Sequence, residues 1–259
     1  MSGFARHWGE AGGRAVLMLH CSLAHSGAWE GMVRSLGPGY RVTAPDILGH
    51  GKAPDIDPAR DLHDQCHEAV LPHLPEGRFD AIGHSFGATL ALRLAEEMPD
   101  RIRSLTLIEP VLFAAAKGSG EFRSYRETIS HFDRLLAAGT REAAAREFLR
   151  LWGAAGGLDD MPEGQRRYMI DRIHFIKASD DALFHDSADL VSGLAQVRAP
   201  TLLVQGGDCL PVTAAVLDRM EKDIPDTTRV SVPGAGHMVP ITHPVPVAKA
   251  VADLFARAG

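Results

Sequence analysis

The sequence predicts an α/β domain in which a mostly parallel sheet is flanked by helices and interrupted by a helical insertion. Three observations support this class. Short apolar runs alternate with longer stretches of helical spacing, as in sheets whose parallel strands are joined by crossover helices. One apolar run passes directly into a helical pattern at Ser85. Between about Phe113 and Val191 the strand-like runs vanish and helical spacing takes over.

Length and composition limit the possible classes of protein. The chain has 259 residues, of which 45% are hydrophobic and 23% charged, which excludes a disordered tail or a disulfide-stapled miniprotein. The net charge is −6 and no basic stripe is present, so we expect no nucleic-acid partner. The sequence does not indicate the oligomeric state.

Cysteine usage and apolar run length bear on the cellular compartment. Cys21, Cys66 and Cys209 form no CxxC pair and are odd in number, which favours a reducing compartment, and we expect the cytoplasm. No stretch approaches the roughly 18 apolar residues of a membrane helix, so no membrane partner is expected.

Six apolar runs are typical of buried parallel strands. They cover Ala15 to Leu19, Arg41 to Ala44, Phe79 to Gly83, Leu105 to Ile108, Thr201 to Gln205 and Arg229 to Val232. After Ser85, apolar residues recur at helical spacing until Pro99, which predicts a helix that starts at the serine. Residues 245–258 carry a second such pattern and predict a closing helix.

The predicted domains are a core of residues 1–113 and 192–259 and a helical cap of residues 114–191. The cap holds eight of the sixteen aromatic residues of the chain in under a third of its length. These rings either line an apolar substrate cavity or pack the small core of the cap itself. The sequence leaves both possibilities open.

The strongest chemical signal is the GxSxG pentapeptide Gly83 to Gly87 at the predicted junction of strand and helix. A serine on so sharp a turn projects its hydroxyl above the sheet, and the two glycines leave room for the turn. We therefore predict that Ser85 is a nucleophile. The alternative is a serine that only caps the helix, which would not explain both glycines.

A serine hydroxyl needs a base, and the base needs a carboxylate to orient it. His237 lies in a loop of small residues directly after the last predicted strand, and we predict that it is the base. Two carboxylates follow strands whose ends should lie nearby, Asp208 and Glu109. We prefer Asp208 as the acid and keep Glu109 as the alternative.

Several further segments resemble those of the α/β-hydrolase superfamily over nearly the whole chain. They are His20 to Leu23 with Trp29, similar to an HGxx(x)W segment, Ala44 to Gly51, similar to PDxxGHG, and the Gly236-His237 and His243-Pro244 pairs. The resemblance implies an oxyanion hole made by the backbone N–H groups of Phe86 and Ser22, with Leu23 as the alternative to Ser22. It also implies that no cofactor is needed.

Two departures from the family pattern stand out. Cys21 replaces the usual glycine after His20, and the turn that carries Asp208 is one residue shorter than usual, which keeps Glu109 in contention. Asp46 and His50 are interpreted as structural. A metal site at His63, His67 and His73 is not expected, because an exposed helical face explains these residues better.

These residues together predict a serine hydrolase with a Ser85, Asp208 and His237 triad that cleaves an ester-like or acyl bond in a small apolar molecule. Hydrolysis of a C–C bond in a diketone-like compound and cofactor-free perhydrolysis use similar scaffolds and stay open. A receptor that keeps the pocket without turnover is a further alternative. The sequence does not identify the substrate.

Overall fold

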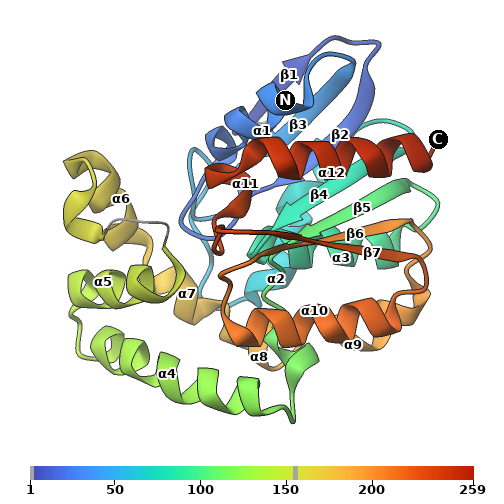
Figure 1. Ribbon diagram of the computed structural model, residues 1–259. Helices are drawn as coiled ribbons and strands as arrows, with labels where there is room; N and C mark the ends of the chain where they lie inside the picture. The colour runs from blue at the N-terminus through green and yellow to red at the C-terminus, as the bar shows by residue number, and fades with distance from the viewer. Residues whose placement is uncertain (1–2, 154–156) are drawn as a thin grey trace.

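A seven-stranded sheet forms the centre of the computed structural model, which describes residues 3–153 and 157–259 (Figure 1). The strand order is β1-β3-β2-β4-β5-β6-β7, with β1 antiparallel to β3 and every other neighbouring pair parallel. The strands are β1 (Ala5–Gly9), β2 (Arg14–Leu19), β3 (Tyr40–Pro45), β4 (Phe79–His84), β5 (Ile102–Ile108), β6 (Thr201–Gly206) and β7 (Thr227–Val232). The predicted fold class is confirmed.

All six predicted strands are present, and the sequence analysis missed only β1. That strand has the sequence ARHWG, and none of its residues is buried. It lies at the edge of the sheet and is paired through its backbone to β3. Trp8 is the one large apolar residue of β1 and is only partly buried against the core, so the strand has no apolar alternation and hydrophobic patterning alone could not reveal it.

Helices cover both faces of the sheet. On one face lie α1 (Glu30–Leu36) and α12 (Pro244–Arg257), and on the other lie α2 (Leu62–Val70), α3 (Phe86–Glu97) and α10 (Pro211–Asp223). The side chains of β2 alternate between the two faces of the sheet. Val16 and Met18 belong to the core under α1 and α12, whereas Leu17 and Leu19 belong to the core under α2, α3 and α10. Because the inner strands are buried on both faces of the sheet, they appear in the sequence as continuous apolar runs.

The predicted insertion lies between β5 and β6, and its described residues form helices and no strand. Its helices are α4 (Gly120–Ala137), α5 (Arg141–Trp152), α6 (Glu163–Arg172), α7 (His174–Ala178), α8 (Asp180–Phe184) and α9 (Leu190–Gly193). Helices α4, α5 and α6 lie together to one side of the sheet (Figure 1). Among the described residues, no helix is long and apolar enough to cross a membrane.

One buried carboxyl group links α3 to α9. Glu96 packs against Gly193, where any side chain would collide with its carboxyl group, and Oε1 of Glu96 is buried without a hydrogen-bond partner in the described residues. Burial, and then the charges of Asp186 and Asp189, raise the pKa of Glu96 to about 8 from an ordinary value of 4.5. Between these two values the unfolded chain ionises Glu96 while the folded protein keeps it protonated.

The free energy of unfolding should therefore fall as the pH rises from about 4.5 to about 8. Glu96→Gln should remove this part of the pH dependence, because glutamine does not ionise. We expect the variant to have a higher Tm than the unsubstituted protein at pH 7.5, with the difference shrinking as the pH falls toward 4.5. Thermal denaturation across this range measures it. Glu127→Gln, at an exposed position of α4, is the control. An equal Tm for the Glu96→Gln and unsubstituted proteins at pH 7.5 would contradict this account.

Candidate active site

Ser85 stands on the turn between β4 and α3, with a positive φ of 57° and ψ of −119°. Such a conformation costs a non-glycine residue about 1–2 kcal/mol and is kept only where its surroundings enforce it. A Cβ at Gly83 would collide with the backbone at Gly87 and Ala88, and a Cβ at Gly87 would collide with the carbonyls of Leu19 and His20. Both glycines of the pentapeptide are thus explained by close backbone approach, and the Ser85 side chain faces a cavity.

His237 lies in the loop between β7 and α11 (Val239–Thr242) and lines the same cavity as Ser85. Its Nδ1 lies 3.2 Å from Oε2 of Glu109. Because a carboxylate only accepts hydrogen bonds, Nδ1 carries the proton, and Nε2 is left as the basic nitrogen. The ring of Trp152 meets the imidazole edge-on, with centroids 4.6 Å apart.

The carboxylate that orients His237 is Glu109, whereas the sequence analysis preferred Asp208. Glu109 follows β5 with φ of 47° and is fully buried, and its Oε1 accepts a hydrogen bond of 2.7 Å from the backbone N–H of Gly206. Asp208 is exposed, and its side chain has no hydrogen bond in the described residues. Its backbone N–H is bound to the carbonyl of Ala235, which fixes the short turn with the carboxylate in solvent.

A residue that the sequence analysis left aside supports His237. His84 lies inside the GxSxG pentapeptide and is buried, with its Nε2 2.8 Å from the carbonyl oxygen of His237. Burial, and then the nearby charge of His237, lower the pKa of His84 well below its ordinary range, so His84 stays neutral and donates this hydrogen bond. The loop that carries His237 is thereby tied to β4, the strand that leads to Ser85.

The two candidates for the second oxyanion amide differ in their partners. The backbone N–H of Leu23 donates to Nε2 of His50 at 2.9 Å and is not free to bind a substrate. For the N–H of Ser22, no acceptor is found within the described part of the chain. Phe86 opens α3, so its N–H has no preceding helical carbonyl to bind. Ser22 and Phe86 are thus the amides free for an oxyanion.

The loops around these amides are held by neutral histidines and one carboxylate. Asp46 accepts hydrogen bonds from the backbone N–H groups of Ser26 and Lys52, at 2.7 and 2.9 Å, and His20 accepts one from Ile47 at 2.9 Å. Burial lowers the pKa of His20 to about 4 and that of His50 to about 3, so both act as uncharged acceptors. Asp46 and His50 have the structural role predicted for them.

Cys21, at the position of the expected glycine, is buried beside the cavity. Burial raises the pKa of its thiol to about 12, so the nucleophilic thiolate is not formed at neutral pH.

Of the three histidines considered for a metal, His63 and His67 are buried and not on an exposed helical face as expected. No group of three or more histidine, cysteine, aspartate or glutamate side chains in the described residues could hold a metal ion.

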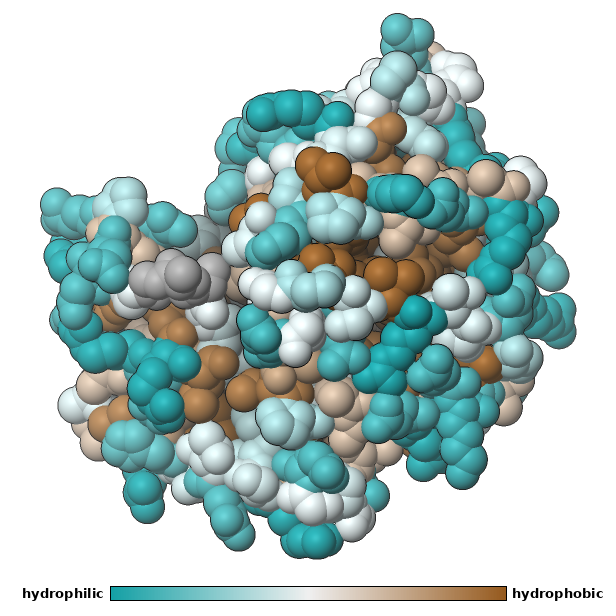
Figure 2. Space-filling model, in the orientation of Figure 1, coloured by the Kyte–Doolittle hydropathy of each residue, from teal (hydrophilic) through white to brown (hydrophobic). Residues whose placement is uncertain are grey.

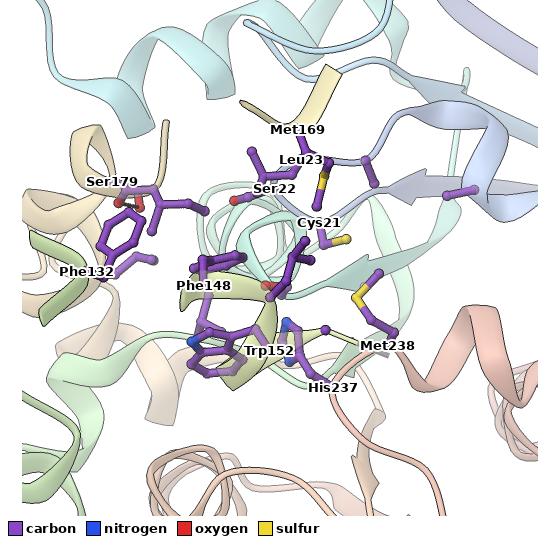
Figure 3. Close-up of a pocket in the computed structure, with 18 of the residues that line it drawn as sticks. Cys21, Ser22, Leu23, Phe132, Phe148, Trp152, Met169, Ser179, His237 and Met238 are labelled. Carbon is purple, nitrogen blue, oxygen red and sulfur yellow. Dashed lines mark hydrogen bonds between the residues drawn. The ribbon is translucent and has the colours of Figure 1, made fainter. Parts of the chain in front are cut away.

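Ser85 and His237 line a cavity of about 700 Å³. Figure 3 shows His237 beside Trp152 at this cavity. Six of the eight aromatic residues in the insertion line it: Tyr125, Phe132, Phe148, Trp152, Tyr168 and Phe184. Apolar side chains are also visible on the surface over α4 and α5 (Figure 2). The same rings also pack against one another, for example Tyr125 on Trp152 and Phe132 on Phe148, so both possibilities left open by the sequence are met.

Tyr168 connects the insertion to the loops of the core. Its hydroxyl donates to the carbonyl oxygen of Ala24 at 2.9 Å and accepts from the backbone N–H of Gly51 at 2.9 Å. The guanidinium of Arg172 lies over its ring, 3.9 Å from the centroid. Since Ala24 is two residues from Ser22, this contact joins α6 to the loop that carries one of the free amides.

The fold and these residues define an α/β hydrolase. Residues 14–244 match the family model of the alpha/beta hydrolase fold, and the chain belongs to this family. It is 28% identical over 240 residues to a pimeloyl-[acyl-carrier protein] methyl ester esterase of Nitrosomonas europaea, covering 87% of this chain and 89% of that protein.

Two further proteins show the range of the family. The chain is 25% identical to a 2-hydroxy-6-oxo-6-(2'-aminophenyl)hexa-2,4-dienoic acid hydrolase of Metapseudomonas resinovorans, over 96% of this chain and 86% of that protein. Among solved structures, an enol-lactonase from Burkholderia xenovorans superposes with a TM-score of 0.77 at 22% identity, over 97% of this chain and 95% of that one. These relatives are hydrolases, and the protein is an enzyme of this class.

Removing the hydroxyl of Tyr168 should loosen α6 and the neighbouring core loop. In Tyr168→Phe we expect amide hydrogen exchange to become about fivefold faster or more in residues 163–172 and 22–24, because each lost hydrogen bond contributes about 1 kcal/mol. Hydrogen exchange with mass spectrometry measures this. Tyr40→Phe removes a hydroxyl that has no hydrogen bond in the described residues and serves as the control. Unchanged exchange in both segments would show that Tyr168 does not hold them together.

Proposed function

We propose that the protein is a serine hydrolase that cleaves an ester bond in a small, mainly apolar molecule, with Ser85, His237 and Glu109 as its triad. One observation carries the proposal: His237, oriented by the buried Glu109, shares an apolar cavity with a serine held on a strained turn. Glu109 takes the role that the sequence analysis gave to Asp208.

The reaction would begin with attack of Ser85 Oγ on the ester carbonyl carbon. His237 Nε2 accepts the serine proton, and the negative charge that develops on the carbonyl oxygen is stabilised by the N–H groups of Ser22 and Phe86. The tetrahedral intermediate then collapses, and the leaving alcohol takes the proton from His237. Water repeats the sequence on the acyl-enzyme, and the acid is released.

Glu109 would stabilise the imidazolium that forms while His237 holds the serine proton. Its second oxygen is bound by the Gly206 N–H, so the carboxylate is fixed in one orientation at the ends of β5 and β6. His84 would keep the His237 backbone in place during the same step. Every step uses groups of the chain and water.

The apolar cavity supports a substrate with an extended hydrocarbon or aromatic part, and residues 114–191 would act as the cap that surrounds it. Two of the similar proteins, named as a methyl ester esterase and an enol-lactonase, support an acyl–oxygen bond. The similarity to a dienoic acid hydrolase keeps C–C hydrolysis as a second candidate. The three cysteines are free, in keeping with a cytoplasmic enzyme.

The choice of acid has a direct test. Glu109→Gln should lower kcat by about 10³ to 10⁴, because it removes the charge that stabilises the imidazolium and orients its tautomer. Asp208→Asn should leave kcat within about twofold, since Asp208 is exposed and does not contact His237. Steady-state kinetics with p-nitrophenyl butyrate measures both variants. The reverse ranking would show that Asp208 is the acid.

The nucleophile can be labelled directly. A fluorophosphonate probe should modify the protein stoichiometrically, and Ser85→Ala should abolish labelling. Intact-protein mass spectrometry measures it, with Ser179→Ala as a control that removes another hydroxyl from the cavity lining. A folded protein that refuses the label would favour a receptor.

Measurements of turnover then distinguish ester hydrolysis from C–C bond hydrolysis. Hydrolysis of p-nitrophenyl acetate, butyrate and octanoate, compared with a diketone panel, tests the ester reaction. No activity on any ester together with cleavage of a diketone would favour C–C hydrolysis.

A further inference from the structure

The cavity has a polar region at the side away from His237. Figure 3 shows Ser179 and Phe132 on one side of the cavity and His237 and Met238 on the other. The residues next to them in the chain, Asp180 and Asp133, also line the cavity. A long substrate bound with its carbonyl at Ser85 would extend toward these two carboxylates.

Two cations near these carboxylates are engaged in other contacts and do not line the cavity. Lys177 pairs with Asp180 at 2.6 Å and with Asp133 at 3.3 Å, is about half exposed, and does not line the cavity. Arg126 lies with its guanidinium 4.5 Å from the centroid of the Phe184 ring and is also outside the lining. Among the described lining residues there is no lysine or arginine.

A negative charge is poorly tolerated in such surroundings. Burial raises the pKa of Asp180 even though Lys177 opposes the shift, which shows that desolvation is already costly for one carboxylate there. A carboxylate of the substrate would lose its water, face two further carboxylates and meet no cation of the lining. A hydroxyl group would instead find acceptors, and a methyl group would find the apolar walls.

We propose that the cavity selects esters whose long arm is uncharged, ending in a hydrocarbon or a hydroxyl group, and rejects arms that end in a carboxylate. The inference rests on the proposed esterase function and specifies its substrate class. It separates this enzyme from relatives whose named substrates are carboxylic acids, such as the dienoic acid hydrolase.

Three methyl esters of similar length test the selection: methyl octanoate, methyl 8-hydroxyoctanoate and monomethyl suberate. Because the methanol part is small, the long arm must occupy the cavity. Binding to Ser85→Ala protein is measured by calorimetry at about pH 8, where the suberate carboxylate is ionised and a free imidazole is largely neutral. Turnover of the same esters by the unsubstituted protein is followed by titration of the released acid.

We expect monomethyl suberate to bind at least tenfold more weakly than methyl octanoate, and the hydroxy ester to bind within about threefold of methyl octanoate. The hydroxy ester separates the effect of charge from that of polarity.

A double substitution, Asp133→Asn with Asp180→Asn, on the Ser85→Ala background should reduce the ratio of suberate to octanoate dissociation constants by fivefold or more. It removes the two negative charges of the lining that would repel the carboxylate. Asp171→Asn removes an exposed carboxylate of the cap that does not line the cavity, and it should leave the ratio unchanged.

Equal or tighter binding of monomethyl suberate, an unchanged ratio in the double variant, or failure of methyl octanoate to bind would each overturn the inference. Failure of the proposed function gives a different result: the esters bind to the Ser85→Ala protein with the expected selectivity, but the unsubstituted protein does not hydrolyse them.

Discussion

The hydrogen bond between His237 and Glu109 is the constraint around which the site is arranged. It joins the loop after β7 to the end of β5, two strands away in the sheet. The same carboxylate binds the backbone of β6 at Gly206, so one buried group connects three strand ends. Because Glu109 is shielded from water, its attraction to a protonated His237 would be weakly screened, which favours the role proposed for His237 as a base.

Neutral imidazoles form the framework of the loops that carry the free amides and the base. His20, His50 and His84 are all buried, and each binds a backbone group at a loop of the site. Burial lowers the pKa of each of them, so these hydrogen bonds persist as the pH moves through neutrality. In the proposed reaction, the loops can therefore hold their geometry while His237 gains and loses a proton.

Much of this arrangement could be predicted from the sequence because it depends on local patterns. Strands buried on both faces form apolar runs, and a glycine-flanked serine between a strand and a helix marks the turn at Ser85. Strand β1 escaped detection because backbone pairing holds it at an edge. The carboxylate that contacts His237, Glu109 in place of the preferred Asp208, could not be chosen from the sequence for a different reason. Both follow neighbouring strands, and the direction of a side chain in a one-residue-shorter turn depends on backbone contacts distant in sequence.

The contact between Glu109 and His237 also bears on the turn after β6, because the Asp208 side chain in that turn does not contact His237. In this chain that turn supplies the backbone N–H of Gly206 to the acid, but the Asp208 side chain projects into solvent. The backbone N–H of Asp208 is held by the carbonyl of Ala235, so this turn depends on backbone hydrogen bonds and not on the carboxylate. A solvent-facing position of this kind is a practical place to attach a label, provided that Gly206 keeps its place in the strand.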